Sequence, residues 1–232
     1  DRAERRSPER SPPPRAGPRD DAGSPDDAVR SATAPGPAPD VSAARELDRW
    51  RRPLYEAGLI GEYADLGIGF GNISKRCGTP GQFLISGTQT GHLARTDERH
   101  YALVTAVDID ANSVRCSGPI KASSEAMTHA AIYALDDRIA AVVHVHSKPL
   151  WDKLRNVLPT TDARVPYGTP DMARELGRLF ANFDFDETGA AVMAGHEEGL
   201  ISFGPSLEAA ASPATSRTGS RPTTVSLDLR SI

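Results

Sequence analysis

The sequence has few aromatic residues and few cysteines, and it lacks any long apolar run. Only 6% of its 232 residues are aromatic. Its two cysteines, Cys77 and Cys116, stand outside any CxxC pattern. A disulfide framework and a thiolate metal site are therefore disfavoured, and this usage fits a reducing compartment. Because no apolar run approaches the roughly 18–20 residues that span a bilayer, we expect a cytoplasmic protein with no membrane partner.

A strong charge of either sign is also missing. The formal net charge is −4, and such a mildly acidic balance gives no electrostatic attraction to nucleic acid or anionic lipid. We therefore expect no nucleic-acid partner. With 38% apolar residues, the chain has enough aliphatic content to build a hydrophobic core.

The composition divides the chain into three parts. Residues 1–41 hold nine of the nineteen prolines and no aromatic residue, so they cannot bury enough apolar surface to offset the entropy of ordering. We predict a disordered tail there. Residues 42–211 have the periodic patterns of a folded domain. Residues 212–232 are rich in Ser, Thr and Arg and are predicted to form a C-terminal tail.

Within residues 42–211, the spacing of apolar residues predicts an α/β domain. Ser42 is a candidate cap for a first helix, and further helices are predicted at 124–135 and 170–182. Strand-like runs, separated by turn residues, lie at 72–77, 82–86, 102–108, 113–116, 140–145, 190–194 and 200–203. These elements predict a mostly antiparallel sheet with helices packed against it.

Two histidines share one of the predicted strands. His144 and His146 alternate with valines, so both side chains point to the same face, about 7 Å apart along the strand, and can chelate one metal ion. The alternative is a pair of polar residues on a solvated strand face. The best candidate for a third ligand is His196, which follows Gly195 and would otherwise be an ordinary loop histidine. Three neutral imidazoles leave an open coordination position, as in catalytic zinc sites.

A second polar cluster precedes the predicted helix at 124–135. The hydroxyl groups of Ser123 and Ser124 and the free N–H groups of a helix N-terminus favour an anion such as phosphate. Glu125 either compensates the helix dipole or, if an anionic substrate binds there, is a candidate general base. His129 lies one turn later and is a candidate hydrogen-bond partner for Glu125.

These motifs together resemble those of the class II aldolase/adducin family. Residues 71–74, residues 123–125, the His144–His146 pair and the late His196 occur in the family's order and approximate spacing, and the resemblance covers roughly residues 43–211. The best-known enzymes of the family are fuculose-phosphate aldolase and ribulose-phosphate 4-epimerase. The resemblance implies a three-layer α/β/α fold around a mainly antiparallel sheet, and a homotetramer with active sites at subunit interfaces.

The resemblance also implies roles for individual residues. His144, His146 and His196 correspond to the ligands of zinc or another divalent metal. Glu125 corresponds to the acidic residue whose carboxylate acts as the catalytic base. The groups that bind the substrate phosphate correspond to Asn72, Ser123, Ser124 and the pair Thr90–Gly91, with Ser86–Gly87 as the alternative pair.

The function implied by the resemblance is that of a zinc-dependent lyase. Such an enzyme acts on a small hydroxy-carbonyl substrate, expected to be a sugar phosphate, through a metal-stabilised enediolate. Alternatives on the same site are an epimerase, a decarboxylase or a dehydratase, and more remotely an iron-dependent oxygenase. A different class is a non-catalytic interaction module of the adducin type.

The sequence departs from the family pattern at three places. Glu197 and Glu198 separate His196 from the glycine that usually follows the third ligand. Either one of them faces the metal or both face solvent, and we expect solvent. The stretch that holds the proton-donating tyrosine of the aldolases is shorter here, so the sequence does not equate Tyr167 with that donor, and we expect Tyr167 to pack against the following helix. No closing helix is recognisable after residues 207–211. Members of the family continue there as an amphipathic helix that helps to form the tetramer.

Overall fold

The computed structural model describes residues 30–155, 157–185, 189–212 and 216–217. Most of the two predicted tails, 1–29 and 218–232, therefore lies outside the described residues. One part of the N-terminal tail prediction is wrong, because residues 30–35 form a β-strand, β1, in the central sheet.

The predicted helices and strands are present close to their predicted bounds, and among the described residues the structure adds two α-helices and five strands that the sequence did not predict. The helices are α1 (Val41–Glu56), α2 (Ala126–Leu135), α3 (Lys148–Leu154), α4 (Pro170–Asn182) and α5 (Leu207–Ala211). The strands are β1 (Arg30–Pro35), β2 (Gly61–Tyr63), β3 (Ile68–Phe70), β4 (Asn72–Arg76), β5 (Phe83–Ser86), β6 (Tyr101–Asp108), β7 (Ser113–Gly118), β8 (Ala141–His146), β9 (Asp184–Phe185), β10 (Gly189–Val192), β11 (Gly199–Gly204) and β12 (Ser216–Arg217).

Eight of the strands in the described part of the chain form one mixed sheet. Their order is β1-β7-β6-β5-β4-β8-β11-β10. β1 runs parallel to β7 at one edge, whereas the other neighbouring pairs are antiparallel. The parallel edge strand comes from the segment before α1, where the sequence predicted no structure.

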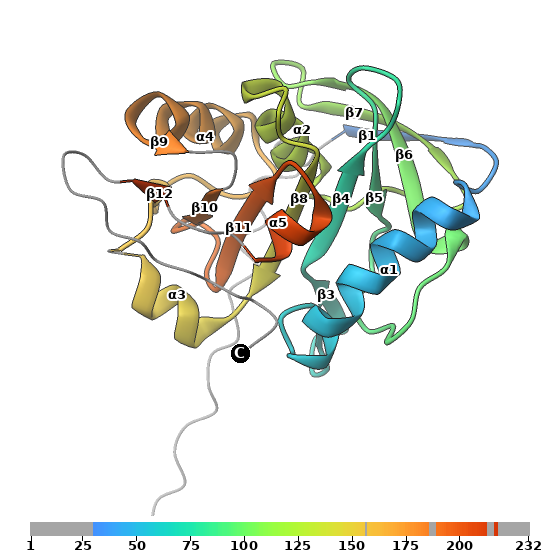
Figure 1. Ribbon diagram of the computed structural model, residues 1–232, viewed down its shortest axis with the longest axis horizontal. Helices are drawn as coiled ribbons and strands as arrows, with labels where there is room; N and C mark the ends of the chain where they lie inside the picture. Colours follow the sequence, from blue (N-terminus) through green and yellow to red (C-terminus); the bar gives the residue numbers. More distant parts are fainter. Residues whose placement is uncertain (1–29, 156, 186–188, 213–215, 218–232) are drawn as a thin grey trace, which may run out of the picture.

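Helices cover both faces of this sheet (Figure 1). The apolar residues of α2 and α4, such as Met127 and Leu176, pack in one cluster with Val142 of β8. Those of α1 and α5, such as Leu47, pack in a second cluster with Val143, the next residue of the same strand. Because alternate residues of a strand face opposite sides, the two clusters lie on opposite faces, and β8 is buried along its whole length.

Local signals account for the ends of the best-predicted helices. α4 begins at Pro170, and Thr169 caps it by accepting a hydrogen bond from the Met172 N–H, which confirms the predicted range. The predicted cap of α1 is wrong by two residues. Asp40, not Ser42, accepts hydrogen bonds from the first-turn N–H groups, because its carboxylate precedes the first helical residue.

Two further findings concern the cysteines and the membrane. Cys77 and Cys116 are both free thiols, as the sequence predicted. Among the described residues, no helix has the length and apolar character needed to cross a bilayer.

Candidate metal centre

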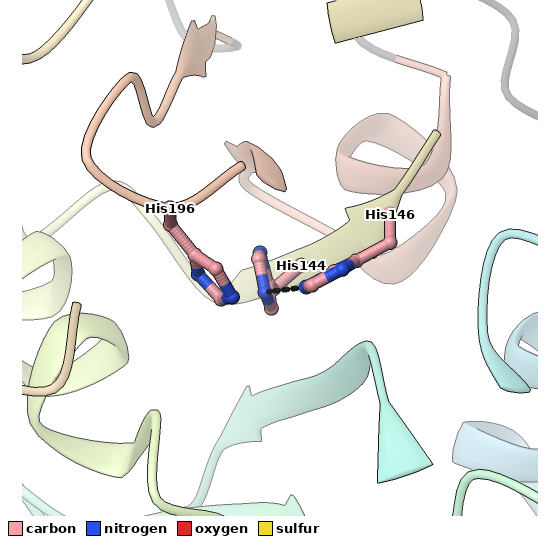
Figure 2. Close-up of side chains that lie close together, drawn as sticks. All are labelled: His144, His146 and His196. Atoms are coloured by element: carbon pink, nitrogen blue, oxygen red, sulfur yellow. Dashed lines mark hydrogen bonds between the residues drawn. The ribbon is translucent and has the colours of Figure 1, made fainter. Parts of the chain in front are cut away.

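Two elements bring the three predicted histidines together. His144 and His146 are on β8, and His196 is in the turn between β10 and β11. β11 pairs antiparallel with β8, which aligns Gly199 with His146 and sets the turn beside the strand. One nitrogen from each ring lies within 4.8 Å of the others, and the three side chains converge in Figure 2.

The rings are in the chemical state that a divalent cation requires. Burial lowers the pKa of His144 to about 4 and holds the pKa values of His146 and His196 well below the ordinary range. All three rings are therefore neutral at pH 7 and offer lone pairs to a metal. Nδ1 of His144 lies 3.0 Å from the Leu200 carbonyl oxygen. A carbonyl only accepts, so Nδ1 carries the proton and Nε2 is the free nitrogen, as is usual for metal-binding histidines.

Glu125 lies directly beside this group. Its side chain is buried, and neither carboxyl oxygen has a hydrogen-bond partner of good geometry among the described residues, although the nearby Thr128 hydroxyl lowers the pKa of Glu125 and so offsets part of the effect of burial. Oε1 is 3.9 Å from Nδ1 of His196. Burial raises the pKa of Glu125 to about 7, which suits a group that exchanges a proton near neutral pH. His129, the predicted partner, instead bonds through Nδ1 to the Ser74 hydroxyl at 2.7 Å.

The histidines open into a cavity of about 950 Å³. All of the predicted site residues line it: Asn72, Thr90, Gly91, Ser123, Ser124, Glu125, His144, His146 and His196. Of the alternative pair Ser86–Gly87, only Gly87 lines the cavity. Ser86 is buried, and its hydroxyl oxygen accepts a hydrogen bond from the Ile73 N–H. The structure thus brings the predicted residues together, while their roles stay predictions.

The serine end of the cavity is built by two loops that run antiparallel, side by side. Gly87 and Ala122 form an isolated bridge, and the Ser123 N–H donates to the Ser86 carbonyl at 3.2 Å. The Thr90 hydroxyl donates to the Gly87 carbonyl at 2.8 Å, so it is already engaged. Oδ1 of Asn72 is buried without a partner among the described residues. This end has hydroxyl and amide groups and suits a polar or anionic ligand.

Sequence reasoning missed two contacts of the histidines. The Tyr63 hydroxyl lies 2.9 Å from Nδ1 of His146 and donates to Oε2 of Glu198 at 2.7 Å. The expectation that Glu198 faces solvent is therefore wrong, whereas Glu197 is exposed as expected. Tyr167 stacks on the ring of His196, with centroids 3.9 Å apart.

Comparison with known proteins gives a family and a fold. The sequence matches the model of the class II aldolase and adducin N-terminal domain over residues 60–216. No curated protein matches it.

Three solved structures illustrate the fold. YgbL from Escherichia coli, described as a candidate aldolase, epimerase or decarboxylase, is 22% identical with a TM-score of 0.52, over 72% of this chain and 80% of that chain. YgbL from Klebsiella pneumoniae is 22% identical with a TM-score of 0.54, over 73% of this chain and 81% of that chain. An L-fuculose 1-phosphate aldolase is 19% identical with a TM-score of 0.54, over 73% of this chain and 78% of that chain. At these identities the likeness concerns the fold alone.

Proposed function

The chain belongs to the class II aldolase and adducin family, and on this premise we propose that it is a zinc-dependent lyase of the aldolase type. It makes or breaks a carbon–carbon bond in a small hydroxy-carbonyl substrate that carries a phosphate. The family membership confirms the resemblance noted in the sequence. The reaction, the metal and the substrate class are our proposal.

The observation that carries the proposal is the buried carboxyl group of Glu125 next to three neutral imidazoles. An unpaired buried carboxyl group is costly to keep. Its position 3.9 Å from His196 and its pKa of about 7 make it a suitable acid and base at neutral pH. A purely structural domain would have no reason to retain this arrangement, which favours an enzyme over an interaction module of the adducin type.

His144, His146 and His196 would hold the metal, since their free nitrogens converge on one point. When bound, a divalent cation supplies a Lewis acid that polarises the carbonyl and hydroxyl oxygens of the substrate. Glu125 takes the proton from the reacting carbon or returns it. Because all three ligands are neutral, the site keeps a net positive charge when loaded, which favours an anionic substrate.

The serine end of the cavity orients the substrate. Ser123 and Ser124 precede α2, so hydroxyl groups and the positive end of the helix dipole face the same ligand group. Asn72 contributes its amide, and the backbone of Thr90 and Gly91 closes the loop that borders this end. Holding the phosphate there fixes the reacting carbon relative to Glu125, and such positioning supplies several kcal/mol of barrier reduction. The homotetramer that the family resemblance implies is part of the same proposal.

The proposal is tested by a screen of ketose phosphates for cleavage and of aldehyde pairs for synthesis, with zinc-loaded protein. Glu125→Gln should reduce turnover by at least about 100-fold, the usual contribution of a general acid or base, without loss of zinc. Glu208→Gln, at an exposed glutamate of α5 that does not line the cavity, is the matched control. Turnover that survives Glu125→Gln would remove Glu125 from the mechanism. Epimerisation, decarboxylation or dehydration without carbon–carbon cleavage would replace the lyase with the corresponding alternative.

A further inference from the structure

Tyr63 links His146 to a carboxylate. The phenol has a single proton, and it donates this proton to Oε2 of Glu198 at 2.7 Å. At Nδ1 of His146, 2.9 Å away, the phenol oxygen can therefore only accept. The three groups form one directed chain, from the imidazole N–H to the phenol and from the phenol to the carboxylate.

This direction fixes the tautomer of His146. With the proton on Nδ1, Nε2 of His146 has a bare lone pair, as Nε2 of His144 does opposite the Leu200 carbonyl. The two Nε2 atoms lie 3.1 Å apart, a contact drawn as a hydrogen bond in Figure 2, which needs a proton on one of the two Nε2 atoms. With both ring protons on Nδ1, as the Leu200 carbonyl and the Tyr63 hydroxyl require, it is instead a contact between two lone pairs. Two lone pairs at that distance repel each other, and a shared cation removes the repulsion. Both rings thus have an unprotonated Nε2, able to bind a metal, on the side where the three imidazoles meet.

The packing around Tyr63 holds the chain in place. Tyr63 and Phe70 come from the paired strands β2 and β3, and their ring centroids are 4.6 Å apart. Phe70 in turn stacks on His146 with centroids 5.3 Å apart. The imidazole is therefore clamped by an aromatic face as well as by a hydrogen bond, which limits its rotation.

Glu198 is held from the other side by the turn that carries His196. Its backbone has φ of +69°, a left-handed conformation that is costly for a glutamate. The Ser147 N–H donates to its carbonyl at 2.9 Å, and the Gly199 N–H donates to the His196 carbonyl at 2.8 Å. One turn thus presents His196 and, two residues later, the carboxylate that anchors the partner of His146.

We propose that Tyr63 and Glu198 are positioning residues that keep His146 in the tautomer with a free Nε2, and so set the strength with which the three histidines bind their cation. The proposal rests on the proposed function in one respect only, the identity of the three histidines as metal ligands. It assigns a purpose to one of the two acids that separate His196 from Gly199.

The first test does not involve a metal. In the metal-free protein, long-range ¹H–¹⁵N correlation spectra of the histidine side chains should show a protonated Nδ1 and an unprotonated Nε2 for His146. Tyr63→Phe, which keeps the ring and removes the hydroxyl, should shift His146 towards the other tautomer, while Glu197→Gln should not. A protonated Nε2 in the wild-type protein, or an unchanged tautomer in Tyr63→Phe, would overturn the proposal.

The second test measures zinc affinity by competition with a chelator. Tyr63→Phe and Glu198→Ala should each weaken binding by about 10–100-fold, the usual effect of losing a group that orients a ligand. Glu198→Gln should weaken it less, because an amide oxygen still accepts, and Glu197→Ala should not change it. Should Tyr63→Phe fold poorly, Glu198→Ala gives the same test with the aromatic packing intact.

The two failures are distinguishable. A wild-type protein that binds no zinc contradicts the proposed function, and the tautomer measurement still decides on Tyr63. A wild-type protein that binds zinc, with Tyr63→Phe and Glu198→Ala binding it equally well, contradicts the positioning role alone.

Discussion

Oε1 of Glu125 lies 3.9 Å from Nδ1 of His196, and neither atom has a hydrogen-bond partner among the residues that the structure describes. Buried groups left in this state cost about 1–3 kcal/mol each. The pair is retained at the wall of a cavity, beside two further neutral imidazoles. We infer that these atoms are left without partners because a cation and a substrate bind to them.

Replacing Glu125 by Gln should change how the stability of the metal-free protein depends on pH. Burial raises the pKa of Glu125 from the ordinary 4.5 to about 7, so between these values the folded state keeps a proton that the unfolded state has lost. The wild-type free energy of unfolding therefore falls as pH rises through this window, by about 3 kcal/mol. In Glu125→Gln this fall is absent. The free energy of unfolding of the variant, relative to that of the wild type, therefore rises between pH 4.5 and 7.

Urea unfolding in the presence of a chelator, at several pH values, measures that difference. Glu197→Gln is the control, because its exposed side chain should give the wild-type profile. A difference between Glu125→Gln and the wild type that stays constant from pH 4.5 to 8 would show that Glu125 titrates normally.

The buried histidines should give the opposite dependence. His144 has its pKa lowered to about 4, and the pKa values of His129, His146 and His196 are also lowered. Below pH 6.5 the histidines of the unfolded state bind protons that those of the folded state do not. Their contribution to the free energy of unfolding is therefore fully present above pH 6.5 and is lost as the pH falls. For His144 alone the loss between pH 6.5 and 5 is about 2 kcal/mol.

Metal-free Glu125→Gln is the right background for this measurement, because it removes the opposing contribution of the carboxyl group. Its free energy of unfolding should drop between pH 7 and 5. An equal or higher value at pH 5 would mean that the imidazoles are accessible to protons in the folded state.

Gly195 should be required for placing His196. A Cβ at this position would lie 1.9 Å from the Val165 carbonyl oxygen, so the turn would have to move. We expect Gly195→Ala to cost about 1–3 kcal/mol of stability, as overpacking does, and to weaken zinc binding. Gly78→Ala is the control, since its Cβ would meet no atom within 4 Å. Thermal unfolding and zinc titration that match the wild type in Gly195→Ala would show that the turn can shift freely.

Much of the site was predictable because its signals are local. The range of α4 follows from Thr169, Pro170 and the apolar spacing behind them. Likewise, the alternation of a β-strand puts His144 and His146 on one face whatever the tertiary structure. His196 was a candidate from its position after Gly195, but its role as third ligand came from the family resemblance, because nothing in its own neighbourhood specifies that β11 will pair with β8.

The remaining features depend on contacts that leave no local trace. β1 is an edge strand without apolar alternation, and its parallel pairing with β7 joins segments far apart in the chain. Tyr63 lies in a strand of three residues, and its partner Glu198 is 135 positions away. The Tyr167 ring stacks on His196, which comes from a different turn of the chain. Such pairings are decided by packing and cannot be read from periodicity.

Titration of the metal-free protein with zinc tests the proposed centre most directly. We expect one zinc ion per chain, with binding lost in each of His144→Ala, His146→Ala and His196→Ala. His92→Ala should retain it, because that exposed histidine faces Glu62, with 3.6 Å between its Nδ1 and Oε2 of the carboxylate. No saturable binding by the wild-type chain, or one ion retained when His196 is replaced, would contradict a centre built from these three histidines.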